Sequence, residues 1–190
     1  MRIRTLATGL AALAALSAAA RAVMTRVPSG LEPVTGFEVS RYMGRWHEIA
    51  RLDHRFERGM TDVTADYSLN ADGSVRVVNS GLRDGQRKSI EGTARFQGDP
   101  GTASLAVSFF PLFPGGYHVF ALDQDYQWAL VSGPDRGYLW ILARQPRMED
   151  ALYDQLVGLA RDRGFPVEGL IRVEHWSEDA ANDSVVTVLA

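Results

Sequence analysis

The feature that most constrains this chain is a succession of short apolar or alternating segments, separated by turn signals, between Gly44 and Arg144. Turns such as Asn70-Ala71-Asp72-Gly73 and Gly98-Asp99-Pro100-Gly101 divide these segments. The predicted strands are 46–52, 63–69, 75–81, 88–96, 103–110, 117–122, 126–132 and 138–144. Such spacing is typical of a sandwich or a barrel, and periodicity alone leaves both open. Sequential hairpins favour an eight-stranded up-and-down antiparallel barrel, because closure removes sheet edges and leaves room for one small ligand.

The pattern changes after the last of these strands. Residues 148–163 carry Leu152, Leu156 and Leu159 at helical spacing, and Gly164 is a suitable stop signal. A last short strand is predicted at 170–173. We therefore expect an all-β barrel with one C-terminal α-helix packed outside it.

The N-terminal residues have the layout of a secretory signal. Arg2 and Arg4 precede an uncharged stretch, 5–20, rich in Ala and Leu, and Ala20-Arg21-Ala22 has the form of a cleavage site. An uncleaved membrane anchor is the alternative, although the apolar stretch is short for one. The predicted organisation is a signal peptide at 1–22, an irregular segment at 23–35, a barrel domain at 36–176 and a tail at 177–190. We expect an exported protein, either periplasmic or secreted.

Charge and cysteine content remove several classes of function. The net charge is -3 and the pI is about 5.8. A net negative charge does not attract the phosphate backbone of a nucleic acid, so such a partner is not expected. The absence of cysteine excludes disulfides, thiolate metal sites and cysteine nucleophiles. It also excludes a lipid anchor on an N-terminal cysteine.

Several motifs resemble one family. Gly44-Arg45-Trp46 resembles the first lipocalin signature, Gly-x-Trp. The stretches 54–59 and 133–142 resemble the bacterial (Blc-type) lipocalins, which are related to apolipoprotein D, and Arg144 stands where the third signature has its arginine. The resemblance extends over 36–176 and implies the lipocalin barrel. Two departures are Gln124-Asp125-Tyr126, which matches the usual Thr-Asp-Tyr only in part, and the missing acylated cysteine of the best-known bacterial members.

The resemblance implies a structural barrel base formed by Gly44, Trp46 and Arg144, with Trp46 closing one end and Arg144 stacked over its ring. Side chains alternate faces along a strand, so Arg144 fixes which residues point inward. On this alternation Ala121 shares a face with Tyr117 and Val119. The residues predicted to line the lumen are Phe56, Ala65, Tyr67, Val77, Asn79, Ala94, Val107, Phe109, Tyr117, Val119, Tyr138 and Trp140.

These inward residues mix small side chains with aromatic rings, which favours a cavity, although a barrel filled by its own side chains is the alternative. The resemblance implies a lipid carrier, with a fatty acid or lysophospholipid as the ligand and a role in envelope maintenance. Arg55 and Arg58 are either contacts for a polar head or ordinary solvated surface. The apolar stretch 109–113 suggests a lip of the pocket, a homodimer contact or a peripheral membrane contact.

Two other functions remain open at this stage. A haem or tetrapyrrole binder would need an inward axial ligand such as Tyr67 or Tyr117. An enzyme is less favoured, because the chain has neither a Gly-x-Ser-x-Gly nor a His-Glu-x-x-His motif, and alternation points His47 and His118 outward. We read Glu48 as an inward carboxylate hydrogen bonded within the barrel. We expect no cofactor, no metal and no catalysis.

Overall fold

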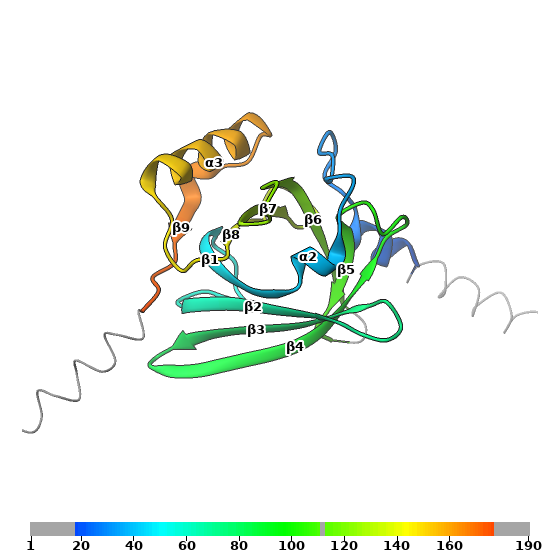
Figure 1. The fold of residues 1–190 in the computed structure, drawn as a ribbon, viewed down its shortest axis with the longest axis horizontal. Coiled ribbons are helices and arrows are strands. Elements are labelled where there is room, and N and C mark those ends of the chain that lie inside the picture. The colour runs from blue at the N-terminus through cyan, green and yellow to red at the C-terminus, as the bar shows by residue number, and fades with distance from the viewer. Residues whose placement is uncertain (1–17, 111–112, 177–190) are drawn as a thin grey trace, which may run out of the picture.

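The computed structural model describes residues 18–110 and 113–176, which form a closed antiparallel β-barrel with one C-terminal helix outside it (Figure 1). The sheet order is β2-β3-β4-β5-β6-β7-β8-β1-β9, and the additional pairing of β2 with β1 closes the barrel. The strands are β1 (Gly44–Leu52), β2 (Thr61–Leu69), β3 (Val75–Arg83), β4 (Gln86–Phe96), β5 (Ser104–Ser108), β6 (Pro114–Leu122), β7 (Trp128–Ser132), β8 (Leu139–Ala143) and β9 (Leu170–Arg172). The predicted fold class is confirmed.

Connections in an up-and-down barrel alternate between its two ends. The loops after β1, β3, β5 and β7 therefore share one end, which we call the mouth, and the turns after β2, β4 and β6 lie at the other end, the base. The short helix α2 (Val39–Tyr42) precedes β1 at the base (Figure 1). Aromatic contacts of Phe37 with Phe96 and of Tyr42 with Tyr126 hold this segment across the base.

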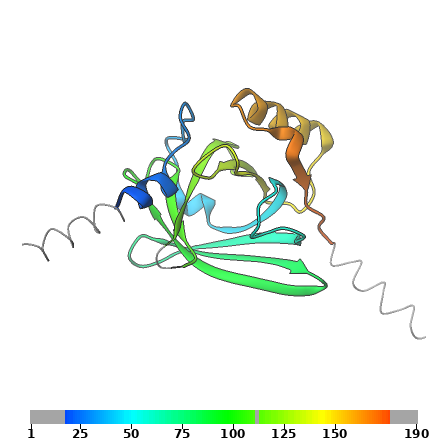
Figure 2. The same ribbon diagram turned by 180° about the vertical axis from the view of Figure 1, so that it is seen from behind.

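The outside of the barrel is covered in two places. Helix α3 (Asp150–Asp162) buries Leu156 and Ala160 in an apolar cluster between the helix and the barrel, here called the outer cluster, which also includes Ile141 of β8 and Leu130 of β7. The 3-10 helix η1 (Val167–Gly169) follows α3, and β9 then pairs with the end of β1. Figure 2 shows α3 and the N-terminal segment on separate parts of the barrel exterior.

The N-terminal segment is more ordered than its sequence suggested. Residues 18–25 are helical, so the first part of the predicted irregular segment 23–35 belongs to a helix. Further along, the amide of Val34 donates to the carbonyl of Val119, and the amide of Ala103 donates to the carbonyl of Val34. Backbone pairing with the barrel therefore fixes a segment whose Pro and Gly content had indicated a loop.

Alternation cannot anticipate the register shifts that occur in three strands, one of them in β2 between Thr61 and Thr64. The register of β1 against β8 shifts between Glu48 and Ala50, and that of β6 against β7 shifts between Val119 and Ala121. A bulge inserts one residue and reverses the faces beyond it. Ala121 consequently packs in the outer cluster, and the prediction that it faces the lumen is wrong.

Three predicted features lie outside the described residues: most of the signal peptide at 1–22, Leu112 within the apolar stretch, and the tail at 177–190. Within the described part of the chain, no helix combines the length and the apolar character that crossing a membrane requires.

Candidate ligand-binding site in the barrel lumen

The barrel interior is lined by one continuous apolar cluster, here called the lumen cluster, which contains Trp46, Leu105 and Leu142. The predicted lumen residues that belong to it are Ala65, Tyr67, Val77, Ala94, Val107, Phe109, Tyr117, Val119 and Trp140. Val77, Ala94 and Val119 are buried, whereas Val107, Phe109 and Trp140 are half-buried. The wall therefore combines a packed part with apolar surface that is still accessible.

Gly92 of β4 shows how closely Phe109 approaches this wall. A Cβ atom at Gly92 would lie 2.7 Å from a ring carbon of Phe109 and 2.7 Å from the carbonyl oxygen of Ser108. Phe109 follows the last residue of β5, so the ring folds back over the neighbouring strand. Only glycine at position 92 leaves room for that ring.

The base of the barrel is built around Trp46. The guanidinium carbon of Arg144 lies 4.0 Å from the centre of the Trp46 ring, a cation–π geometry, and the indole nitrogen donates to the carbonyl of Tyr42 at 2.8 Å. Gly44 has φ +91, and a Cβ there would lie 3.5 Å from Nη1 of Arg144. The left-handed backbone, rather than lack of space, is therefore what requires glycine at this position.

A chain of three tyrosine hydroxyls lies inside the barrel. The hydroxyl of Tyr117 is 2.7 Å from that of Tyr42 and 3.0 Å from that of Tyr67. Burial raises the pKa of all three phenols, so each stays protonated at neutral pH. These groups stabilise one another by hydrogen bonds, and a phenolate is strongly disfavoured here.

A charged group of side chains lies at the other end of the lumen. The bulge in β1 lets both Glu48 and Arg51 point inward, opposite Leu142 and Trp140 of β8. Arg51 donates from Nη1 to Glu48 at 2.7 Å, and both side chains are almost fully buried. The predicted role of Glu48, a carboxylate hydrogen bonded within the barrel, is confirmed by this contact.

Residues 53–60, here called the mouth loop, fold onto this ion pair. Arg51 donates from Nη2 to the carbonyls of Glu57 and Met60, at 2.7 Å and 3.2 Å. The Glu57 carboxylate accepts a hydrogen bond from the Trp140 indole at 3.1 Å and lies 2.9 Å from Nε2 of His54. We call Glu48, Arg51, His54, Glu57 and Trp140 the mouth cluster.

The two carboxyl groups of the mouth cluster differ in proton affinity. Burial and the neighbouring Glu57 raise the pKa of Glu48 well above its usual value, although Arg51 opposes this shift. Burial also acts to raise the pKa of Glu57, but the contacts with His54 and Trp140 outweigh it and leave that pKa below its usual value. The surroundings therefore shift the two pKa values in opposite directions, upward for Glu48 and downward for Glu57.

The remaining predicted site residues lie around this cluster. Tyr138 stacks on Trp140, with ring centres 6.1 Å apart, and its ring centre is 5.8 Å from that of His54. Asn79 on β3 pairs with Ala65 of β2, and its Oδ1 is buried without a hydrogen-bond partner among the described residues. Phe56 is 58% exposed, so it lies on the outside of the mouth loop rather than in the lumen wall.

The two arginines considered for a polar head occupy the surface. Arg55 stacks over the Phe56 ring at 4.7 Å, and Arg58 donates to Asp53 at 2.9 Å. Arg83 of β3, which was not singled out from the sequence, donates instead to the carbonyl of Phe56 at 2.8 Å. The residues at this candidate site that sequence reasoning missed are therefore Arg51, Glu57 and Arg83.

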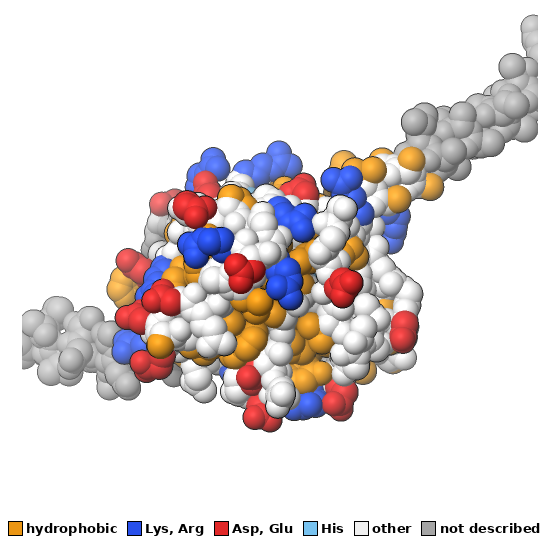
Figure 3. Space-filling view, turned by 90° about the horizontal axis from the view of Figure 1, so that it is seen from above, with side chains coloured by type: hydrophobic (Ala, Val, Ile, Leu, Met, Phe, Trp, Pro, Cys, Tyr) orange, Lys and Arg blue, Asp and Glu red, His pale blue; other side chains and the backbone are white. Residues whose placement is uncertain are grey.

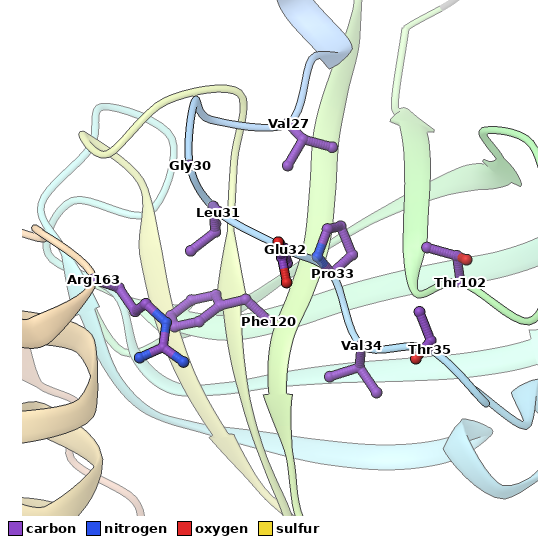
Figure 4. Close-up of a pocket in the computed structure, with 10 residues that line it drawn as sticks. All are labelled: Val27, Gly30, Leu31, Glu32, Pro33, Val34, Thr35, Thr102, Phe120 and Arg163. Carbon is purple, nitrogen blue, oxygen red and sulfur yellow. The ribbon is translucent and has the colours of Figure 1, made fainter.

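A separate hollow of about 830 Å³ lies on the outside of the barrel (Figure 4). The segment from Val27 to Thr35 passes along it, with Phe120 of β6 and Arg163 at the end of α3 on its other side. Leu31 and Phe120 of its lining belong to the outer cluster, whereas Val34 packs against the lumen cluster. On the face shown in Figure 3, charged side chains of both signs surround patches of apolar surface.

Comparison with known proteins places this geometry in a family. Residues 37–175 match the model of the lipocalin-like domain. The outer membrane lipoprotein Blc of Citrobacter freundii is 51% identical over 149 residues, which cover 77% of this chain and 84% of the relative. Temperature-induced lipocalin-1 of Arabidopsis thaliana is 43% identical (74% of this chain, 80% of the relative), and mouse apolipoprotein D is 32% identical (70% and 74%).

Solved structures show the same barrel. Insecticyanin from the tobacco hornworm Manduca sexta superimposes with a TM-score of 0.63 at 19% identity, covering 82% of this chain and 89% of that one. The cockroach allergen Per a 4 superimposes with a TM-score of 0.64 at 15% identity, covering 80% and 96%. These two likenesses concern the fold alone. The domain match and the identities to the Blc proteins show that this chain belongs to the lipocalin family.

Proposed function

We propose that this lipocalin is a lipid carrier that holds the acyl chain of a fatty acid or lysophospholipid in its lumen. The observation that carries the proposal is the lumen cluster, in which small residues such as Ala65 alternate with half-buried rings such as Phe109 and Trp140. Burial of each methylene contributes about 0.8 kcal/mol, so ten methylenes contribute about 8 kcal/mol before ordering costs are subtracted. A gain of that size corresponds to a dissociation constant of about 1 μM before those costs, so micromolar or tighter binding requires a longer acyl chain.

The setting of this function is the cell envelope. The relatives that support it carry the name outer membrane lipoprotein Blc. We propose that residues 1–22 are a cleaved export signal and that the mature chain acts in the periplasm or outside the cell, storing or transporting lipids in envelope maintenance. Cleavage there would remove the first part of the helix at 18–25 but would keep the hydrogen bond from Gln97 to the carbonyl of Thr25, which ties the remaining segment to the barrel.

The mouth also offers a surface for peripheral contact with membranes. Phe110 is 58% exposed and Phe113 is 66% exposed, and both belong to the β5–β6 connection at the mouth. Exposed aromatic rings of this kind suit the interfacial region of a bilayer. We propose that they bring the mouth to a lipid surface, and a homodimer through the same rings is the competing use.

The alternatives find less support. Iron ligation by Tyr67 or Tyr117 would require a phenolate, yet both hydroxyls are hydrogen bonded to neighbouring tyrosines and burial raises the pKa of both phenols. For a lipid-modifying enzyme, the candidate general bases discussed from the sequence are His47 and His118. His118 is instead buried between Ser104 and the carbonyl of Arg26, outside the lumen cluster.

The carrier proposal is tested with two tryptophan variants. Trp140 belongs to the lumen cluster, whereas Trp128 packs in the outer cluster. In a titration of the purified protein with oleate, Trp140→Ala should weaken binding about tenfold, which is about 1.4 kcal/mol, while Trp128→Ala should leave it within a factor of two. Equal effects of the two changes, or no oleate binding to the wild type at micromolar concentrations, would overturn the proposal.

A further inference from the structure

Two arginines beneath the mouth loop, the buried Arg51 and the half-buried Arg83, each have a buried Nε without a partner among the described residues. Arg51 is 2% exposed, and its Nε makes no hydrogen bond with any residue that the structure describes. The Nε of Arg83 is also buried and also makes no hydrogen bond with a described residue. Both groups nevertheless hold the mouth loop through Nη2, Arg51 at the carbonyls of Glu57 and Met60 and Arg83 at the carbonyl of Phe56.

The side chain of His54 adds a third polar group to this region. It is 9% exposed, and its ring packs edge-on to Trp140, with ring centres 5.3 Å apart. Its Nε2 is close to Glu57, but neither ring nitrogen makes an aligned hydrogen bond within the described part of the chain. A buried donor that is left unpaired is costly, so such a group is a candidate for pairing with water, an ion or a ligand.

The charges in this region favour an anion. Arg51 and Arg83 each carry a positive charge. Arg51 is paired with the Glu48 carboxyl group, and Glu57 lies beside His54. Arg83 forms no ion pair with any residue that the structure describes and is held only at the carbonyl of Phe56. Its charge is therefore uncompensated and leaves an excess of positive charge at the mouth end of the lumen.

The placement ties this excess charge to the lumen. Arg51 is the register partner of Trp140, whose ring belongs to the lumen cluster, and Trp140 donates directly to Glu57. An acyl chain lying along the lumen wall would therefore end its apolar part beside Trp140. The next groups that it meets are the unpaired Nε of Arg51 and the imidazole ring of His54.

We propose that Arg51, Arg83 and His54 form a binding site for the anionic head of the lumen ligand, either a carboxylate or a phosphate monoester or diester. This inference rests on the proposed lipid carrier and assigns the head to groups beneath the mouth loop. Arg55 and Arg58, for which the sequence left open either a head contact or solvated surface, are instead engaged with Phe56 and Asp53 on the surface.

The test compares ligands that share one acyl chain and differ in head charge. Oleate is compared with oleyl alcohol, and 1-oleoyl lysophosphatidylglycerol with 1-oleoylglycerol, by titration of the purified protein. The wild type should bind the charged member of at least one pair about tenfold more tightly than its neutral partner, and the pair that shows the preference identifies carboxylate or phosphate as the head.

Arg83→Gln is the informative variant, and Arg58→Gln is its control because it removes a charge from the same mouth without touching the buried donors. Arg83→Gln should abolish the preference for the charged ligand and leave the affinity for the neutral one within a factor of two; Arg58→Gln should leave both unchanged. Equal affinities of the wild type for charged and neutral ligands, or equal losses for both in Arg83→Gln, would refute the head site while preserving the carrier. Absence of binding by all four ligands would refute the carrier itself.

Discussion

Replacement of Arg144 by Met tests the barrel base. Arg144 is stacked 4.0 Å above the centre of the Trp46 ring, and its guanidinium also donates to three backbone carbonyls, those of Arg41 and Arg45 at 2.8 Å and that of Tyr126 at 3.2 Å. Met keeps the apolar stem of the side chain but removes the charge and every donor. The change therefore isolates the polar part of the arginine.

The magnitude follows from what each contact is worth. A cation–π pair contributes about 0.5–2 kcal/mol. A hydrogen bond from a charged donor contributes about 1.5–3 kcal/mol where the carbonyl cannot reach water. The carbonyls of Arg41 and Arg45 are at the surface and regain water, so only the partly buried bond to Tyr126 counts fully. We expect Arg144→Met to lower the free energy of unfolding by about 2–4 kcal/mol.

Urea unfolding, followed by tryptophan fluorescence and by far-UV circular dichroism, measures this loss. Arg41→Met is the matched control, because Arg41 also stacks over a ring, that of Tyr126 at 4.2 Å, but is exposed and paired with Glu38. It should cost less than about 1 kcal/mol. A loss below about 1 kcal/mol for Arg144→Met, or one no larger than that of Arg41→Met, would refute the assigned role of Arg144.

Three further predictions concern other parts of the fold. Burial lowers the pKa of His118, so the free energy of unfolding should fall as the pH drops below about 6.5. The fall should be smaller in His118→Gln. The same pH dependence in the variant and the wild type, measured by urea titration, would contradict this. Gly44→Ala should cost about 1–2 kcal/mol by the same assay, since φ is +91, and a neutral effect would argue against backbone strain. The double change Phe110→Ser and Phe113→Ser should reduce flotation of the protein with phosphatidylglycerol vesicles. Leu69→Ser, which removes a 51% exposed side chain at the base, should not. Equal flotation of the double variant and the wild type would refute the membrane contact, and loss of a dimer in the double variant would favour a homodimer through these rings.

The sign of the His118 prediction follows from its surroundings. The ring is buried between Ser104 and the carbonyl of Arg26, and burial favours its neutral form over the opposing effect of nearby carbonyls. The unfolded chain takes up a proton near pH 6.5, but the folded chain does so only at lower pH. The stability is therefore present above pH 6.5 and is lost as the pH falls through the folded-state pKa.

Much of the barrel could be predicted because its strands are delimited by local signals. The turn at Asn70-Ala71-Asp72-Gly73 and the breakers around Gly98 and Gly133 are visible in the sequence, and the strands lie between them. The short helix α2 could not be predicted, since four residues are too few to show helical spacing. The N-terminal segment was also beyond prediction, because its order depends on backbone pairing with strands far along the chain.

The site was predictable only where strands are regular. Alternation placed Ala65, Tyr67 and Trp140 in the lumen cluster, but it assigns Arg51 the face opposite to Trp46. The bulge in β1 reverses that assignment, and no residue near the bulge indicates its presence in the sequence. Glu57 and Arg83 were missed for another reason: their roles come from how the mouth loop folds over the barrel, which is a tertiary property.

Native mass spectrometry of the purified mature protein, followed by organic extraction, tests the central claim most directly. We predict one fatty acid or lysophospholipid per chain, identified by mass after extraction and displaced by added oleate. A protein that remains empty after purification, and that binds no acyl probe at micromolar concentrations, would contradict the account of the lumen as a lipid-binding site.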